Sequence, residues 1–300
     1  MNTLEVGRRI TLKNILFATD FSQCSNAALS YALSLARRYG ATIHAAHVIP
    51  TANDLLFVSD EAWPAAAEEE DRRIRGYIEE LDHQLAGVAH DVRTPKGKVV
   101  DVLLRMIKEN DVDLVITGTH GRTGVRKLLL GSVAEEIFRR CPCPVFSVGP
   151  HVQPAPGNGS EFHHVLFTTD FSNASLTALP YAISVAEEDQ AQLTLLNVVL
   201  ESEKGLLHPE RLRMSLMRRL GELVPPEAEL WCHPECEIEF SERFVSPAET
   251  ILEIAKSKAV DLIVLGTRAA GSGAGIVAHL ASTTARILTK APCPVLLVRG

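Results

Sequence analysis

The chain has 300 residues, of which 46% are hydrophobic and 22% charged, and its formal net charge is -7 at pH 7. The hydrophobic fraction excludes an intrinsically disordered chain, and the length suffices for two domains of ordinary size. The acidic balance argues against nucleic acid as a partner, because neutralising phosphates needs a basic face. No apolar run reaches the roughly 18–20 residues that a membrane-spanning helix needs, so we expect no membrane span.

The cysteines and the first residues of the chain indicate a compartment. The six cysteines are scattered along the sequence, too sparsely for a disulfide scaffold. Residues 1–13 are polar and lack the apolar stretch of a secretory signal peptide. We therefore expect a cytoplasmic protein with reduced thiols.

The sequence repeats itself at an interval of about 150 residues. Three segments return in the same order: ILFATDFS as VLFTTDFS, VDLVITGT as VDLIVLGT, and CPV unchanged. A period this long indicates duplication of a whole domain, since solenoid repeats are far shorter. We place a first domain at residues 1–151, a Pro- and Gly-rich linker at 152–160 and a second domain at 161–300.

In each copy, short apolar runs alternate with longer segments of helical periodicity. In the first copy we expect strands at residues 15–19, 42–49, 88–94, 113–117 and 144–148. Helices should lie between them, at about 24–36, 68–85, 99–107 and just before 144. In the second copy we expect strands at 165–169, 192–200, 228–240, 261–265 and 294–298, with helices at 174–186, 209–223 and 248–255. Asp20 or Ser22 should cap the first helix, and Asp170 or Ser172 its counterpart.

The apolar runs show which sheet these strands form. Residues 262–265, for example, read LIVL without alternation, which is typical of a strand buried on both faces of a parallel sheet. Strands alternating with helices through right-handed crossovers give a doubly wound α/β domain. We therefore predict two tandem doubly wound domains, each a roughly five-stranded parallel sheet flanked by helices.

A glycine-rich loop follows the fourth strand of the first copy. Gly118, Gly121, Gly131 and Ser132 follow the spacing Gly-x2-Gly-x9-Gly-Ser. Glycines let backbone approach a ligand and adopt positive φ, and successive N–H groups can form an anion-binding nest. Gly131 and Ser132 would open a helix, whose N-terminus attracts phosphate. The spacing alone fits two interpretations: a loop that wraps a triphosphate, or an ordinary glycine turn followed by a helix cap. The loop matches neither the P-loop motif nor the Gly-x-Gly-x-x-Gly fingerprint.

Three motifs together resemble the universal stress protein family over nearly the whole chain: Asp-Phe-Ser after the first strand, the VDLVITG strand and the full glycine motif. The resemblance implies an adenine-nucleotide alpha-hydrolase-like Rossmann variant, and the glycine motif is typical of its ATP-binding branch. It implies ATP in the first domain, with Mg2+ on the phosphates. It also implies that the last strands of the two domains meet, as in the family's dimers, and two tandem chains could pair further as a homodimer.

The resemblance also implies which residues hold the nucleotide. The nucleoside would be contacted by Ala18, Thr19, Asp20 and Val48. Ribose and phosphates would be contacted by Gly118, His120, Gly121, Arg122, Gly131, Ser132, Val133 and Ala134. His120 could act as an acid or base, since an imidazole titrates near neutrality, or contribute its backbone alone.

The second copy departs from this pattern. Its equivalent positions are Asp170, Val198, Gly266 and Ser282, but Ala269 and Ala281 stand where glycines should be, and the interval is two residues longer. The added methyl groups could block phosphates, although the rebuilt GSGAG loop could also form a different nest. We expect a degenerate second site, weak or empty for ATP, with Asp170 serving as a helix cap.

Two groups of cysteines are candidates for a metal site or a redox pair. On an extended strand, Cys232 and Cys236 would point to one face and His233 to the other. This is too few ligands for zinc, and we expect no metal. Cys141 and Cys143 could form a redox pair, but buried small hydrophobes are favoured.

The expected function is therefore a stress-response protein that binds ATP in its first domain and acts as a nucleotide-responsive regulator or scaffold for a protein partner. Two alternatives stay open. One is a slow ATPase or self-phosphorylating enzyme, for which only His120 and Ser132 are sensible candidates; we assign no catalytic residue. The other is a nucleotide-free binding module for a protein or an apolar ligand.

Overall fold

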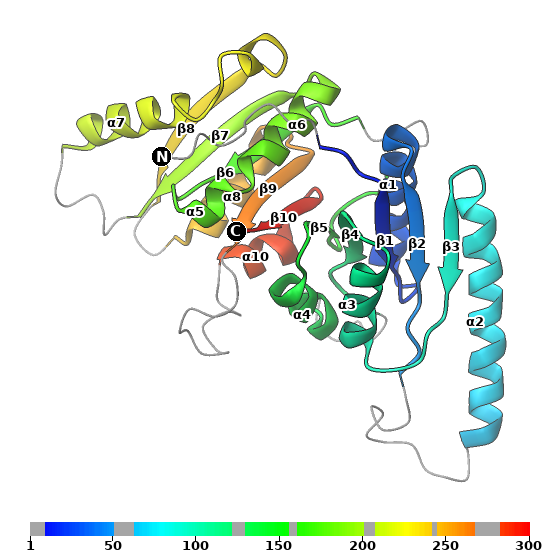
Figure 1. Cartoon of the computed structure of the whole chain (residues 1–300). Helices are drawn as coiled ribbons and strands as arrows, with labels where there is room; N and C mark the ends of the chain where they lie inside the picture. Colours follow the sequence, from blue (N-terminus) through cyan, green and yellow to red (C-terminus); the bar gives the residue numbers. More distant parts are fainter. Residues whose placement is uncertain are drawn as a thin grey trace.

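The chain forms two α/β halves (Figure 1), described by a computed structural model over residues 10–50, 63–121, 130–155, 161–200, 208–241, 245–267 and 283–300. The strands of the first half are β1 (Asn14–Ala18), β2 (Thr42–Ala46), β3 (His90–Arg93), β4 (Leu114–Gly118) and β5 (Val145–Val148). The strands of the second half are β6 (His164–Thr168), β7 (Gln192–Val199), β8 (Pro234–Phe240), β9 (Leu262–Thr267) and β10 (Val295–Arg299).

The strands join into one ten-stranded sheet in the order β3-β2-β1-β4-β5-β10-β9-β6-β7-β8. Every neighbouring pair is parallel except β5 and β10, which run antiparallel, with Phe146 opposite Leu296. The order reads the same outward from this central pair, so each half repeats the other about an approximate two-fold axis. The predicted α/β fold is confirmed, and the last strands of the two halves meet as expected.

Helices cover both faces of each half. The first half has α1 (Gln23–Tyr39), α2 (Trp63–Leu85), α3 (Val99–Glu109) and α4 (Ser132–Arg140). The second half has α5 (Asn173–Leu176), α6 (Leu179–Asp189), α7 (Pro209–Gly221), α8 (Pro247–Ser257) and α10 (Thr283–Lys290). Alternate residues of β1 enter two cores: Ile15 and Phe17 pack with α1 and α2, whereas Leu16 packs with α3 and α4. The unbroken apolar strand sequences follow from this burial on both faces.

Two elements of the second half differ from the sequence prediction. The helix expected over residues 174–186 is divided into α5 and α6, with Pro180 in the first turn of α6. Proline has no N–H to donate into a preceding turn and tolerates the first turn of a helix, so the break falls just before it. The strand expected from residue 228 begins only at Pro234, because Ala228–Leu230 forms a 3-10 turn.

Side-chain contacts join the two halves beside the central strand pair. The Arg38 guanidinium lies 2.8 Å from the Asp189 carboxylate, and Tyr39 donates its hydroxyl to Glu188. Asp189 also accepts a hydrogen bond from the Phe162 backbone N–H, at 2.8 Å. The residues before β1 reach across as well, since the Ile10 N–H donates to the Ser184 hydroxyl at 2.8 Å.

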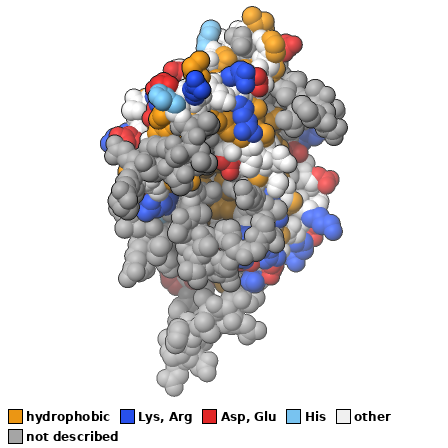
Figure 2. All heavy atoms as spheres, turned by 90° about the vertical axis from the view of Figure 1, so that its left-hand side faces the viewer, with side chains coloured by type: hydrophobic (Ala, Val, Ile, Leu, Met, Phe, Trp, Pro, Cys, Tyr) orange, Lys and Arg blue, Asp and Glu red, His pale blue; other side chains and the backbone are white. Residues whose placement is uncertain are grey.

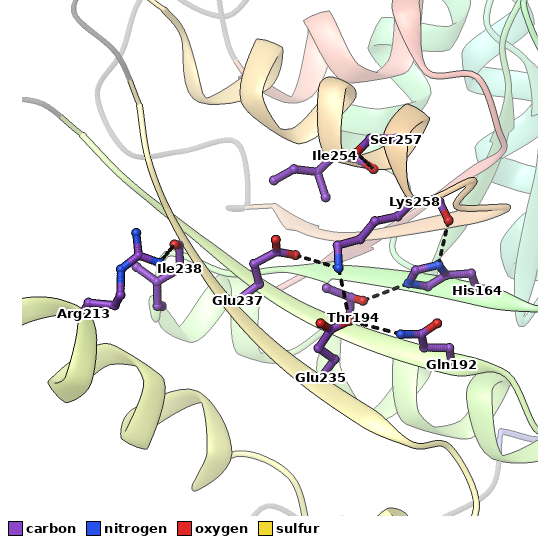
Figure 3. A network of polar contacts seen from close by, with 10 residues as sticks. All are labelled: His164, Gln192, Thr194, Arg213, Glu235, Glu237, Ile238, Ile254, Ser257 and Lys258. Carbon is purple, nitrogen blue, oxygen red and sulfur yellow. Dashed lines mark hydrogen bonds and ion pairs between the residues drawn. The ribbon is translucent and has the colours of Figure 1, made fainter. Parts of the chain in front are cut away.

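A polar network fastens the far edge of the sheet in the second half (Figure 3). The Lys258 ammonium lies 3.1 Å from Glu235 and 3.3 Å from Glu237, both on β8. His164 contacts the Thr194 hydroxyl at 2.8 Å and the Lys258 carbonyl at 3.0 Å. His164 is the first residue of β6, so this network lies near the amino ends of the second-half strands and ties α8 to the sheet.

The outer surface of the second half is partly apolar. Figure 2 views this side of the molecule, where hydrophobic atoms are interspersed with basic and acidic ones. The exposed large hydrophobic residues concentrate on α7 and the 3-10 turn: Met214, Met217, Leu230 and Trp231. None of the helices described is long and apolar enough to cross a membrane.

Candidate functional site

The candidate site lies where the carboxyl ends of β1 and β4 meet the start of α1. The Thr19 N–H donates to the Ala46 carbonyl at 3.0 Å, and the Thr119 N–H donates to the Val148 carbonyl at 3.0 Å. These bonds extend the strand ladders by one residue and hold both loop starts in line. In open parallel sheets, ligands bind at this edge.

Asp20 braces the turn between β1 and α1. One of its carboxylate oxygens accepts hydrogen bonds from the Ser22 N–H and the Ser25 hydroxyl, each at 3.0 Å. Ser22 is the helix cap, since its hydroxyl accepts the Ser25 N–H at 3.3 Å. Phe21 adopts φ 60°, a left-handed conformation that costs a non-glycine residue free energy. Of the two caps that the sequence allowed, Ser22 is therefore correct, and Asp20 fixes the turn.

Each of the three glycines of the motif lies where an added Cβ would meet another atom of the protein. A Cβ at Gly118 would lie 2.9 Å from Cys24 Cβ, where α1 packs on β4. A Cβ at Gly121 would lie 2.7 Å from an Asp20 carboxylate oxygen, and one at Gly131 would lie 3.1 Å from the Thr119 carbonyl oxygen. The left-handed glycines described are Gly40, Gly87 and Gly97, so positive φ is not the reason for this motif.

Gly131 opens α4 without a side-chain cap. It is the N-cap of the helix, and its own N–H donates to the Thr119 carbonyl at 2.9 Å. Ser132 and Val133 are exposed at the first turn, whereas the Ala134 side chain is buried in the core. First-turn N–H groups have no partner within their helix, so this terminus suits an anion. Arg122, at the other end of the predicted phosphate loop, lies outside the described residues.

His120 ties the loops after β1 and β4 together. Its carbonyl accepts the Ser22 hydroxyl at 3.0 Å, and its Nδ1 contacts the Thr119 hydroxyl at 2.7 Å. Nε2 is buried and has no hydrogen-bond partner among the described residues. Burial lowers the pKa of this imidazole, and nearby His151 lowers it further, so the ring is neutral at pH 7.

His47, which follows β2, contacts the turn between β1 and α1. Its Nδ1 contacts the Thr19 carbonyl at 2.9 Å, and its ring lies 4.7 Å from Phe21, which stacks on Tyr77 at the same distance. Val48, the predicted adenine contact, is buried beside α3 and α4. His47 was not among the residues predicted from the sequence; the available signal was Asn197 at the same position of the second copy, another polar residue among apolar strand residues.

A cavity of about 270 Å³ opens between α1 and α2, next to this aromatic group. Its lining combines apolar and polar side chains: Phe17, Thr19, Phe21, Asn26, Leu29, Tyr77, Glu80, Leu81 and Gln84. Among the described residues, Thr19 is the one that the cavity shares with the predicted nucleotide contacts. The glycines of the motif lie apart from it.

The second half reproduces the turn itself. Phe171 adopts φ 58°, the Asp170 carboxylate accepts the Ser172 N–H at 2.9 Å, and the Asn197 amide donates to the Thr169 carbonyl at 2.8 Å. A Cβ at Gly266 would lie 2.1 Å from the Ala174 carbonyl oxygen. Packing of α5 thus explains Gly266, and the turn explains Asp170. Val198 lies half-buried on β7, while Ala269, Ala281 and Ser282 lie outside the described residues.

Cys232 and Cys236 do not share a strand face, contrary to the sequence interpretation. Cys232 precedes β8, is buried, and donates its thiol to the Ala228 carbonyl. Cys236 lies on β8 and packs against the same core. His233 adopts φ 41° between them, so the chain turns here where an extended strand was assumed.

Comparisons with known proteins agree with this architecture. The model of the universal stress protein family matches residues 11–149 and 161–299. A universal stress protein of Methanocaldococcus jannaschii is 27% identical over 139 residues, which cover 45% of this chain and 81% of that protein. A putative universal stress protein of Staphylococcus aureus strain USA300 is 31% identical over 153 residues, covering 49% and 89% respectively.

Solved structures resemble the whole chain. The crystal structure of a universal stress protein from Archaeoglobus fulgidus superimposes with a TM-score of 0.66 at 22% identity, covering 95% of this chain and 98% of that one. A putative universal stress protein from Pseudomonas aeruginosa gives a TM-score of 0.61 at 16% identity, covering 96% and 93%. At these identities the likeness establishes the fold, including two halves in one chain.

Proposed function

The chain belongs to the universal stress protein family, and we propose that its first half binds ATP and makes the protein a nucleotide-responsive regulator or scaffold in a stress response. One observation carries the proposal. Asp20 and Gly121 touch across the loops after β1 and β4, with the uncapped N-terminus of α4 beside them. Asp20, Gly121 and Gly131 therefore lie close together, which supports a single binding place.

The groups gathered there match the parts of a nucleotide. The Asp20 carboxylate, held by Ser22 and Ser25, can accept hydrogen bonds from ribose hydroxyls. The first turn of α4 can receive phosphates through backbone N–H groups and the helix dipole. The backbone at Val48 would meet the base, and Mg2+ would neutralise charge on the phosphates.

We propose that the second half binds ATP weakly or not at all. In its sequence, Ala269 and Ala281 replace the equivalents of Gly121 and Gly131. In the first half, a Cβ added at those two glycines would lie 2.7 Å and 3.1 Å from the nearest atom. Its retained residues, Asp170 and Gly266, already have folding roles. The second half would then serve as a scaffold or as the surface for a protein partner.

Calorimetric titration of ATP–Mg2+ into the whole chain tests the proposal. We expect one site per chain, and Gly121→Ala should weaken it by at least about tenfold, because the new methyl group meets the Asp20 carboxylate. Gly76→Ala is the matched control, since a Cβ at that position in α2 meets nothing within 4 Å. It should bind as the wild type does.

Three outcomes would contradict the proposal in different ways. An absence of binding in the wild type would remove ATP as the ligand and favour a nucleotide-free module. Equal affinity in Gly121→Ala, with an unchanged unfolding temperature, would place any nucleotide elsewhere, for example in the cavity between α1 and α2. Two sites per chain would show that the second half tolerates its alanines.

A further inference from the structure

Two thiols face each other where α4 passes into β5. Cys141 and Cys143 flank Pro142, and their sulfur atoms are 3.5 Å apart. Both are free; Cys141 is buried and Cys143 is partly exposed. We propose that these two residues are a redox-active dithiol that a hydroperoxide converts reversibly into a disulfide.

The local geometry brings the sulfur atoms within reach of a bond. A disulfide bond is about 2.0 Å long, so the sulfur atoms must approach by about 1.5 Å. Pro142 fixes one backbone dihedral of the short segment and so limits the conformations that separate them. A ring closed across a single intervening residue is strained, and strained disulfides are the easily reduced ones. This suits a reversible reaction.

The electrostatics favour a thiolate in the pair. The hydrogen bond between the two thiols lowers the pKa of Cys141 in spite of its burial, and the positive charge of Arg299 acts in the same direction. The same hydrogen bond and burial raise the pKa of Cys143. Of the two residues, Cys141 therefore loses its proton more readily, and the thiolate is the form that reacts with oxidants.

The reaction balances with hydrogen peroxide as the oxidant. The Cys141 thiolate attacks one peroxide oxygen, the O–O bond breaks, and the leaving hydroxide takes up a proton to become water. Cys141 is then a sulfenic acid. The Cys143 sulfur attacks the Cys141 sulfur, the S–S bond forms, and the departing hydroxide leaves as water with the Cys143 proton. Two thiols and one peroxide give one disulfide and two waters.

The second half provides an internal reference for this pair. At the equivalent turn it has Ala291, Pro292 and Cys293, so its cysteine lacks the neighbouring thiol. Cys293 is buried, and burial raises the pKa of its thiol. Ala291 is also buried, which shows that alanine fits this turn. Cys141→Ala therefore copies an arrangement that the fold already accepts.

The position of the pair gives its oxidation a structural consequence. The Cys141 N–H closes the last turn of α4 by donating to the Ile137 carbonyl at 2.8 Å. The Cys141 carbonyl accepts a hydrogen bond from Arg299 on β10, at 3.5 Å, across the junction of the halves. Drawing the sulfur atoms together would strain both contacts, and oxidation should therefore lower the unfolding temperature of the chain.

Peptide mass spectrometry of the whole protein after hydrogen peroxide treatment tests the proposal. Cleavage after Arg140 and Lys204 releases residues 141–204, which contain Cys141 and Cys143 and no other cysteine. We expect this peptide to lose two hydrogen atoms on oxidation and to regain them with dithiothreitol. Cys141→Ala and Cys143→Ser should abolish that loss while keeping the unfolding temperature of the reduced wild type.

Different results would overturn it. The proposal fails if the peptide keeps both thiols under conditions that oxidise an added model dithiol, or if it gains oxygen atoms with no loss of hydrogen. It also fails if Cys143 is oxidised as fast in Cys141→Ala as in the wild type, because the two thiols would then act independently. The Cys293 peptide, analysed in the same digest, should remain unmodified.

Discussion

The first and second halves build the same turn after their first strands but differ in the glycine motif that follows their fourth strands. Both place an aspartate, a left-handed phenylalanine and a capping serine between strand and helix. Both also keep a glycine, Gly118 or Gly266, against the start of the following helix. Only the first half keeps Gly121 and Gly131. The shared residues thus shape the turn in both halves, and Gly121 and Gly131 distinguish the half that we propose binds ATP.

The junction between the halves has diverged in a complementary way. Gly40 and Gln190 both end their helices in the left-handed conformation, so Arg38 and Tyr39 occupy the positions of Glu188 and Asp189. Within one chain the basic and phenolic groups meet the two carboxylates. Two copies of the second half paired in this manner would bring carboxylates together, which like-charge repulsion disfavours.

We expect the largest effect from substituting the glycine that each half keeps against the start of a helix, Gly118 or Gly266. Gly266→Ala should destabilise the protein by about 3 kcal/mol, because its Cβ would lie 2.1 Å from the Ala174 carbonyl oxygen and the helix must move. Gly118→Ala, with contacts of 2.9 Å, should cost about 1–2 kcal/mol. Urea unfolding measures both. Gly76→Ala should be neutral or stabilising by about 0.5 kcal/mol, and equal costs at all three positions would refute the packing explanation.

The second prediction breaks the complementary junction. Arg38→Ala should cost about 2 kcal/mol, because it leaves the Asp189 carboxylate, only 3% exposed, without its ion partner. Arg72→Ala removes an ion pair whose side chains are 71% and 70% exposed, and it should change stability by less than about 0.5 kcal/mol. Thermal unfolding of both variants tests this. A double variant with Asp189→Asn should recover part of the loss; no recovery would show that Arg38 acts through packing.

The third prediction exchanges equivalent residues of the two turns. His47→Asn should cost about 1 kcal/mol, because asparagine can donate to the Thr19 carbonyl as Asn197 does to Thr169, while the ring contact with Phe21 is lost. His47→Leu should cost more, since that carbonyl would lose its partner. If the asparagine variant is the less stable of the two in urea unfolding, the halves do not use these residues equivalently.

The smallest effect is a pH dependence confined to the first half. Because burial lowers the folded-state pKa of His120, the unfolded chain binds a proton first as pH falls. Stability should therefore decline from about pH 6.5 downward and level off below the folded-state pKa. In His120→Asn this contribution should disappear, so the difference between the two unfolding-temperature profiles should be constant above pH 7 and change below about pH 6.5. Parallel profiles at all pH values would exclude His120 as its source.

The duplication, the order of strands and helices, and the turn after each first strand could all be predicted from the sequence. These features are local: burial periodicity, capping residues and glycine spacing are written in neighbouring positions. Comparison of the two repeats also distinguishes their glycine loops. The boundaries were less accurate where proline or a 3-10 turn broke a periodic pattern, as in α5, α6 and β8.

The atoms that the motif glycines face, and the distant side chains that come into contact, depend on the tertiary structure. Gly118 faces the start of α1, whereas Gly121 faces the Asp20 carboxylate, although both belong to one motif in the sequence. The Arg38–Asp189 pair joins residues 151 positions apart, and the distance between the Cys141 and Cys143 sulfur atoms depends on a turn of the backbone. The ion pair follows from the pairing of the two halves through β5 and β10, which no local pattern encodes.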